Sequence, residues 1–306
     1  MSVSEIGADV RQDRRAVWLL LICVTLWSTS GLLIKESTLP AMAIVSGRSL
    51  LTAIVVALYI RRPHFTWSLP QVGGAVMQAA TFVLFVMATQ MTSAANAILL
   101  QYTAPLWVAL FGAWYLHERP RRIDYITMAM IACGMLLFFG DKLTGSGMVG
   151  NILAIISGIT MAWMTLFLRK QKDGSPMETI LLGNVLAAVI GLPFLLTSSP
   201  TSMDIGILLF LGIFQLGIPF ILYGYAIVRL PALEVVLIST LEPILNPLWV
   251  FLFNGELPGP MAIVGGAIVL LAALVRGLAM TAKPGGKSIS SRSGPAEPER
   301  EPEPAS

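Results

Sequence analysis

Lysine and arginine recur at regular intervals along this chain, and the segments between them are almost entirely apolar. From Arg11 to Arg276 the basic clusters fall in every second gap between apolar stretches of about twenty residues, which is the length of helix that crosses a bilayer core about 30 Å thick. Loops rich in Lys and Arg stay on the cytoplasmic side of a membrane. The pattern therefore predicts ten membrane crossings with both termini in the cytoplasm.

The composition agrees with an all-α integral membrane protein. Of the 306 residues 12% are charged and 56% are hydrophobic, whereas soluble domains carry about 25% charged residues. The net charge of +3 is explained by loop charge that sets orientation, so we expect no nucleic-acid partner. The expected helices cover residues 17–35, 40–60, 70–91, 95–116, 123–140, 148–169, 177–197, 204–228, 232–253 and 260–280.

The two terminal segments are expected to lie outside the membrane. Residues 1–16 form a cytoplasmic N-terminal segment, and residues 281–306 are rich in Pro, Glu, Ser and Gly, which is typical of a disordered tail. Residues 145–150 match the letters of a dinucleotide-binding fingerprint, but they join two predicted membrane helices and lack the βαβ unit that such a site needs. We therefore expect no cofactor and no metal.

The two halves of the chain resemble each other. Residues 27–35 (WSTSGLLIK) are similar to residues 163–171 (WMTLFLRKQ), and the Pro-x12-Glu-x-Pro pattern that starts at Pro105 returns at Pro243. Each half has five crossings, which is an odd number, so the second half must be inserted upside down. Inverted repeats are recurrent in secondary transporters, where the substrate site lies at the repeat interface near mid-membrane. We expect one repeat over 17–140 and an inverted repeat over 148–280.

These motifs resemble the EamA family of the drug/metabolite transporter superfamily. The resemblance covers about residues 17–280, and it implies an exporter or exchanger of small metabolites. The aromatic-rich helices resemble most the YddG-type aromatic amino acid exporters of that family. The resemblance further implies a multi-pass protein of the inner (plasma) membrane that works as a monomer. One departure concerns symmetry, because Asn184 stands where the first half has Arg48.

Two ionisable residues fall inside predicted helices. Charges in a membrane span are costly, so they usually face a cavity or a partner. Arg48 can hold a substrate carboxylate through two parallel hydrogen bonds, and Glu242 can pair with an ammonium group or carry a proton. The alternative is that either charge pairs with another protein group, or that the Arg48 side chain extends outward to the membrane surface. Glu118 and Glu256 lie at helix ends, where a gating or capping role is expected.

Prolines and aromatic residues complete the predicted lining. A proline in a membrane helix frees a backbone carbonyl, so Pro105 and Pro243 mark kinks, and Asn246 adds a polar side chain beside Glu242. Aromatic rings can stack on a cation or an aromatic substrate, although packing explains them equally well. The further substrate-binding candidates are Trp27, Ser28, Gln78, Tyr102, Trp163, Asn184 and Tyr223.

Three classes of function compete at this point. The predicted one is an exporter of small amphiphilic metabolites, above all neutral and aromatic L-amino acids, that works by alternating access. The same architecture could instead export lipophilic cations, drugs or nucleobase-type metabolites, or act as a passive channel. An enzyme is disfavoured, because His64 and His117 are the two histidines of the chain and no HExxH, CxxC or paired-aspartate motif occurs.

Overall fold

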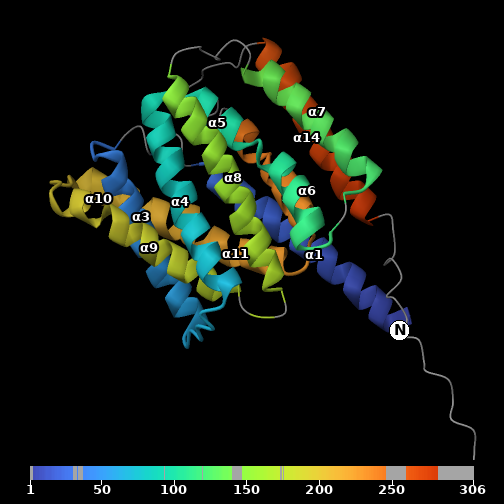
Figure 1. The fold of residues 1–306 in the computed structure, drawn as a ribbon, viewed down its shortest axis with the longest axis horizontal. Coiled ribbons are helices and arrows are strands. Elements are labelled where there is room, and N and C mark those ends of the chain that lie inside the picture. Colours follow the sequence, from blue (N-terminus) through green and yellow to red (C-terminus); the bar gives the residue numbers. More distant parts are fainter. Residues whose placement is uncertain are drawn as a thin grey trace, which may run out of the picture.

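The chain folds into a bundle of helices. The structure is a computed structural model that describes residues 3–29, 33, 37–92, 94–118, 120–139, 147–172, 174, 176–245 and 260–281. Every regular element in these residues is a helix, which confirms the all-α class. Figure 1 shows one bundle in which α7 (Arg122–Phe139) and α14 (Pro260–Thr281) lie side by side at one flank.

The other helices follow each other along the chain. The first half contains α1 (Val3–Trp27), α3 (Ala41–Ile60), α4 (Leu69–Met91), α5 (Ala94–Gln101) and α6 (Ala104–Tyr115), and the second half contains α8 (Met148–Lys170), α9 (Pro176–Leu196), α10 (Ser202–Phe210), the π-helix η2 (Leu211–Gly217), α11 (Ile218–Ile227) and α12 (Ala232–Ser239). Five segments of the described chain are long and apolar enough to cross a membrane: Ala41–Ile60, Leu69–Ala88, Met148–Lys170, Pro176–Leu196 and Ser202–Ile227. The described helices fit ten crossings.

Six helices have the expected bounds, and the first does not. α3, α4, α7, α8, α9 and α14 begin and end within one residue of the predicted ranges. α1 begins at Val3 and ends at Trp27, so the prediction of a helix over 17–35 is wrong at both ends. At the C-terminal end of α1 the hydroxyls of Ser28 and Thr29 each donate to a carbonyl oxygen three residues earlier, at 2.7 Å. These bonds give hydrogen-bond donors to backbone carbonyls in the last turn of the helix.

The predicted helix over 95–116 is broken into α5 and α6. The turn at Tyr102 and Thr103 precedes Pro105, which has no N–H for the helical ladder. An equivalent turn at Thr240 and Leu241 follows α12 and precedes Pro243. The two breaks lie 138 residues apart, which is also the spacing of the two prolines. The repeat in sequence therefore reappears as a repeated interruption of the backbone.

A π-helix interrupts the segment predicted over 204–228. η2 separates α10 from α11 and is followed by Pro219, which cannot donate to the carbonyl four residues earlier. The carbonyl oxygen of Gly212, at the start of η2, accepts a hydrogen bond from Thr52 Oγ1 of α3 at 2.9 Å. Short π-helical segments are found most often at functional sites, and this one borders the residues described below.

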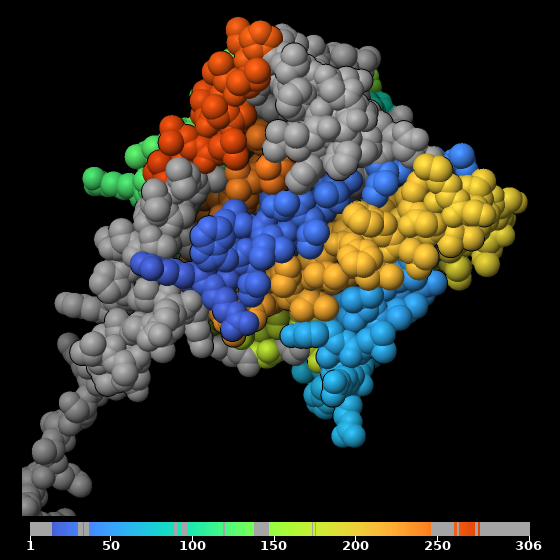
Figure 2. All heavy atoms as spheres, turned by 180° about the vertical axis from the view of Figure 1, so that it is seen from behind, coloured from blue at the N-terminus to red at the C-terminus, as the bar shows by residue number. Residues whose placement is uncertain are grey.

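The close contacts between helices occur in related pairs. When the two halves are exchanged, the contact of α4 with α8 corresponds to the contact of α11 with α1. In the same way, the contact of α4 with α9 corresponds to the contact of η2 with α3. α3 packs on α9 and α7 packs on α14, so each of these two pairs joins a helix to its own counterpart in the other half. Figure 2 shows α1 (blue) lying along the orange segment that contains α11, with α3 (light blue) and α9–α10 (yellow) on the same face.

Basic residues from separate loops meet at one end of the bundle. The Arg15 guanidinium lies 5.6 Å from the Tyr225 ring centroid, Gln171 Nε2 donates to Pro70 O at 3.2 Å, and His64 N donates to Glu178 Oε1 at 3.3 Å. The middle of α1 and the beginnings of α4 and α9 therefore lie together with the ends of α8 and α11. We call this the basic end, with Arg14, Arg15, Arg61, Arg62, Arg121, Arg122, Arg169, Lys170, Lys172 and Arg229.

Close packing of η2 on α3 gives a first prediction. A Cβ at Gly212 would lie 3.0 Å from Arg48 O and in conflict with the Leu51 side chain, so Gly212→Ala is expected to destabilise the protein by about 1–3 kcal/mol. Gly206, on the adjoining α10, has nothing within 4 Å of such a Cβ. Gly206→Ala is the matched control and should leave the melting temperature in detergent unchanged or raised. Equal melting temperatures for the two variants would contradict the close approach of η2 and α3.

Candidate functional site

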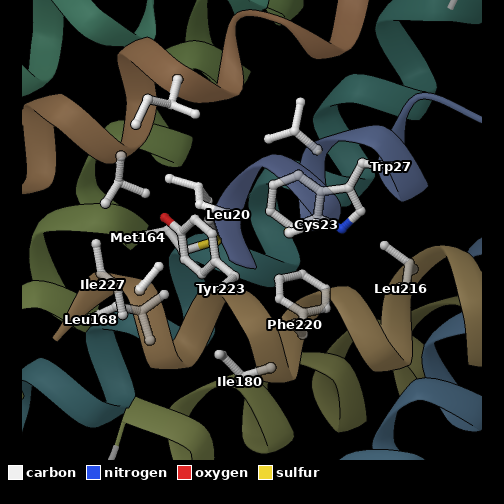
Figure 3. Close-up of a cluster of buried hydrophobic side chains, with 14 of the residues drawn as sticks. Leu20, Cys23, Trp27, Met164, Leu168, Ile180, Leu216, Phe220, Tyr223 and Ile227 are labelled. Carbon is white, nitrogen blue, oxygen red and sulfur yellow. The ribbon is translucent and has the colours of Figure 1, made fainter. Parts of the chain in front are cut away.

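Four aromatic side chains from three helices meet in the core of the bundle. The Trp27 ring lies 5.6 Å from Phe220 and 5.4 Å from Tyr223 between centroids, and Phe82 lies 6.1 Å from Phe220. Figure 3 shows the side chains of Trp27, Phe220 and Tyr223 next to one another, and Cys23 of α1 belongs to the same buried cluster. We call Trp27, Phe82, Phe220 and Tyr223 the aromatic cluster. The planes of these rings are inclined to one another at 69°, 40° and 51°, and each ring is apolar with a partial negative charge on its faces.

Arg48 places a buried positive charge beside the aromatic cluster. Its side chain is 7% exposed, and its Cζ atom lies 5.3 Å from the Phe82 ring centroid. Arg48 Nε is buried without a hydrogen-bond partner among the described residues. The ion pair found in that part of the chain joins Arg169 to Glu118, so no described carboxylate lies within 4.0 Å of the Arg48 guanidinium nitrogens. A buried cation that lacks an ion-pair partner is available to bind an anion.

Glu242 supplies the opposite charge. Tyr102 Oη donates a hydrogen bond of 2.6 Å to Glu242 Oε2, so the side chains at the two equivalent helix breaks are joined directly. Arg48 and Glu242 lie close enough to interact electrostatically, but they do not approach within the 4.0 Å of an ion pair. The site thus keeps a cation and an anion apart in one apolar region, and a ligand with both charges can bind to the two of them.

Three buried amides add acceptor oxygens. Gln78 Nε2 and Asn184 Nδ2 both donate to Ile180 O, at 3.4 and 2.8 Å, and Gln215 Nε2 donates to Trp27 O at 3.2 Å. The amide oxygens of all three residues are buried with no partner among the described residues. In native proteins, most buried polar atoms have a hydrogen-bond partner. These oxygens can therefore accept from an ammonium group, a hydroxyl group or a bound water.

We call Arg48, Gln78, Tyr102, Asn184, Gln215, Glu242 and the aromatic cluster the central site. Sequence reasoning missed Phe82, Phe220 and Gln215, because nothing in an apolar stretch marks which phenylalanine faces inward. Gln215 had a detectable signal, since it is an uncharged polar residue inside a predicted membrane helix.

Several predicted site residues have other surroundings. Trp163 belongs to a second group of rings, with Phe111 at 5.1 Å and Phe167 at 5.5 Å between centroids, and the structure does not bring it to Trp27. Ser28 is buried and bonds to the backbone at the end of α1 as described above. Tyr223 Oη lies 3.1 Å from Thr165 Oγ1. Asn246 and Glu256 lie outside the described residues.

Glu118 is part of a polar contact at the basic end. Arg169 Nε donates to Glu118 Oε1 at 2.8 Å, and the other carboxylate oxygen, Oε2, accepts from Ala232 N at 3.1 Å. The Arg169 guanidinium also donates to Ile227 O at 3.1 Å and to Val228 O at 2.7 Å. We call this contact the clasp. It joins the segment after α6 to α8, α11 and α12 at the basic end.

Comparison with known proteins identifies relatives along nearly the whole chain. The EamA-like transporter family matches residues 14–140 and again residues 148–277. The chain is 24% identical to the pseudopaline exporter CntI of Pseudomonas aeruginosa over 272 residues, which are 85% of this chain and 95% of that protein. It is 23% identical to the uncharacterised transporter YwfM of Bacillus subtilis over 270 residues, or 84% and 91% of the two chains.

A third relative and a solved structure complete the comparison. The chain is 26% identical to the threonine/homoserine exporter RhtA of Escherichia coli over 193 residues, which are 61% of this chain and 63% of RhtA. A protein of known crystal structure has the same fold, with a TM-score of 0.76 over 86% of this chain and 98% of that one, at 19% identity. The fold is therefore shared with a protein of remote sequence.

Proposed function

The chain belongs to the EamA-like transporter family and is a membrane transporter whose named relatives are exporters, and from this premise we propose that it exports neutral and aromatic L-amino acids. One observation carries the proposal. Arg48 and Glu242 lie in one apolar region without pairing, beside the rings of the aromatic cluster. An amino acid has a carboxylate, an ammonium group and a side chain that match these three parts.

The chemistry at each part supports this substrate class. A guanidinium binds a carboxylate through two parallel hydrogen bonds, and Glu242 with the free amide oxygens of Gln78 and Gln215 can accept from an ammonium group. The rings of Trp27 and Tyr223 form a surface on which an aromatic or aliphatic side chain packs. Two relatives give further support, since one is named for export of the amino acids threonine and homoserine and the other is named an exporter.

We propose alternating access between two inverted repeats, 17–140 and 148–280, as the transport mechanism. The helix contacts support this arrangement, because exchanging the two halves turns the contact of α4 with α8 into that of α11 with α1. The breaks before Pro105 and Pro243 support it as well, because they place two flexible turns at equivalent positions, and the side chain at one break bonds to a residue beside the other. Rocking of one half against the other can open the central site to either side.

The clasp supports a state that is closed at the basic end. We place this end in the cytoplasm, because loops rich in Lys and Arg are retained there, and we place the protein in the inner (plasma) membrane with both termini inside. Residues 1–16 then form a cytoplasmic segment, and the tail from residue 281 lies outside the described residues apart from Thr281. The central site is built within one chain, which supports a transporter that works as a monomer.

Counterflow in proteoliposomes tests the substrate class. Vesicles loaded with an unlabelled neutral or aromatic amino acid should take up the labelled compound faster than vesicles without protein. A panel of threonine, leucine, phenylalanine and tryptophan covers the small, aliphatic and aromatic side chains. Failure of every member of the panel, with protein that is folded by its melting curve, would exclude the amino-acid proposal.

Replacing Glu242 separates amino-acid export from the competing function. Glu242 is the buried anion of the central site, so it also suits export of lipophilic cations and drugs, which is the second candidate function. Glu242→Gln is expected to lower the affinity for amino acids by about tenfold, the loss of one charged hydrogen bond. If the variant loses only lipophilic cations and retains amino acids, the second candidate is correct. Tyr125→Phe, an exposed change on α7, serves as the control for handling and reconstitution.

A further inference from the structure

A pocket separate from the central site opens at the basic end. It has a volume of about 250 Å³ and lies between the end of α3, the beginning of α9 and the end of α11. The residues that line it are Tyr59, Lys172, Gly174, Pro176, Met177, Ile221, Gly224, Tyr225, Val228 and Arg229. Pockets for drug-sized ligands measure about 300–1,000 Å³. This pocket is smaller, and it fits a polar head group.

The charged residues among the described lining of the pocket are basic. Lys172 and Arg229 both line it, and none of the described lining residues is acidic. The Arg15 guanidinium lies 5.6 Å from the ring of Tyr225 and adds a third cation beside the pocket. Asp173 and Ser175, which adjoin the pocket in sequence, lie outside the described residues.

Arg229 is held in place for binding. Its guanidinium stacks on the Tyr225 ring, with Cζ 3.5 Å from the centroid, and one terminal nitrogen donates to Tyr225 O at 2.9 Å. Arg229 Nε is buried and has no partner among the described residues. The stacking fixes the planar group before any ligand binds. A fixed guanidinium with an unused donor favours a phosphate oxygen, which it can bind through two hydrogen bonds.

The surface next to the pocket is apolar. Leu50, Ile54 and Leu58 follow each other at four-residue spacing on α3 and are 46%, 48% and 71% exposed, so they form one stripe along the helix. Tyr59, at the end of the same helix, lines the pocket and is 58% exposed. In a membrane this stripe faces acyl chains. A ligand whose head lies in the pocket can therefore place its chain along α3.

We propose that this pocket binds the phosphate group of an anionic phospholipid, with Arg229 and Lys172 as its ligands. Basic pockets between membrane helices on the cytoplasmic side are suited to anionic head groups. The pocket also touches the clasp, because Val228 lines it and its carbonyl oxygen accepts from Arg169. A bound lipid thus holds the end of α11 against α8 and stabilises the state that is closed at the basic end. The proposal depends on insertion in a membrane and not on the identity of the exported substrate.

Thermal stability of the purified full-length protein in detergent tests the site. Short-chain phosphatidylglycerol is titrated against phosphatidylcholine with the same chains, and inorganic phosphate forms a third arm. Phosphatidylglycerol should raise the melting temperature, and phosphatidylcholine should not. Lys172→Gln and Arg229→Gln should each raise the lipid concentration for half-maximal effect by about tenfold. Arg62→Gln removes an exposed cation of the same end that does not line the pocket, and it should leave the response unchanged.

The outcomes separate the possible sources of the phosphate. In one outcome, inorganic phosphate raises the melting temperature and Lys172→Gln removes the effect, while phosphatidylglycerol has none. That result would assign the pocket to soluble phosphate compounds and overturn the lipid source. Equal responses of the wild type, Lys172→Gln and Arg62→Gln to phosphatidylglycerol would overturn the site itself. Lys172 is exposed, so its variant keeps the test valid even if Arg229→Gln does not fold. Arg229→Lys retains the charge and should retain part of the response.

Discussion

Replacing Arg48 by glutamine is expected to reduce the affinity for a carboxylate-bearing substrate by about 10–100-fold. The reason is the loss of charged hydrogen bonds, which contribute about 1.5–3 kcal/mol each, and about 1.4 kcal/mol corresponds to tenfold. Arg48 is 7% exposed and has no ion-pair partner among the described residues. The glutamine variant therefore removes a buried, unneutralised charge, and its melting temperature should not fall.

The measurement uses matched ligands and a matched variant. Binding of an aromatic amino acid is compared with binding of the amine that lacks its carboxylate. Arg48→Gln should weaken only the amino acid, whereas Arg61→Gln, an exposed cation just after the same helix, should change neither. Equal loss of both ligands would show that Arg48 shapes the site without touching a carboxylate. Unchanged binding of the amino acid would remove Arg48 from the substrate site.

Replacing Arg169 by alanine is expected to destabilise the protein by about 3 kcal/mol. This lies at the low end of the range for breaking a buried pair, because the Glu118 side chain is 29% exposed and water can solvate it. The same change leaves Ile227 O and Val228 O without their donor. The melting temperature should fall by about 6–12 °C. Transport should fall as well, because the basic end no longer closes.

A double-mutant cycle separates the clasp from general damage. Glu118→Gln and Arg169→Gln are measured singly and together, and a direct contact predicts a coupling energy of about 0.5–3 kcal/mol. Arg121→Ala, an exposed change at the same end, should leave stability and transport unchanged. Additive effects of the two clasp variants would contradict a direct ion pair. Full transport activity of Arg169→Ala would contradict a role of the clasp in closing the basic end.

The positions of the helices were largely predictable from sequence. The bounds of α3, α4, α8 and α9 follow from apolar stretches that end at charged residues, prolines or short polar loops, and these signals are local. The break at Tyr102 and Thr103 was missed although Pro105 was identified as a kink. Proline shows where a hydrogen bond is lost, but the neighbouring helices decide whether the backbone bends or breaks. The π-helix has no comparable signal.

The central site was predictable only in part. Arg48 and Glu242 stand out in sequence because charges inside apolar stretches are rare, and the structure places both of them in one region. Phe82 and Phe220 could not be distinguished from phenylalanines that face lipid, since a membrane helix is apolar on all sides. The pairing of Glu118 with Arg169 depends on tertiary structure and spans 51 residues. Glu118 was expected at a gate or cap, but its partner was not predicted.

Two halves inserted in opposite directions are the central claim, and labelling of equivalent loops tests it most directly. Residues 62 and 198 lie 136 residues apart, as do the similar segments 27–35 and 163–171, and they follow α3 and α9. Arg62→Cys and Ser198→Cys are made singly in a Cys133→Ala background, because Cys133 is exposed and Cys23 is buried. A membrane-impermeant maleimide should label position 62 only from the cytoplasmic side and position 198 only from the outside. Labelling of both positions from the same side would contradict the inverted repeat.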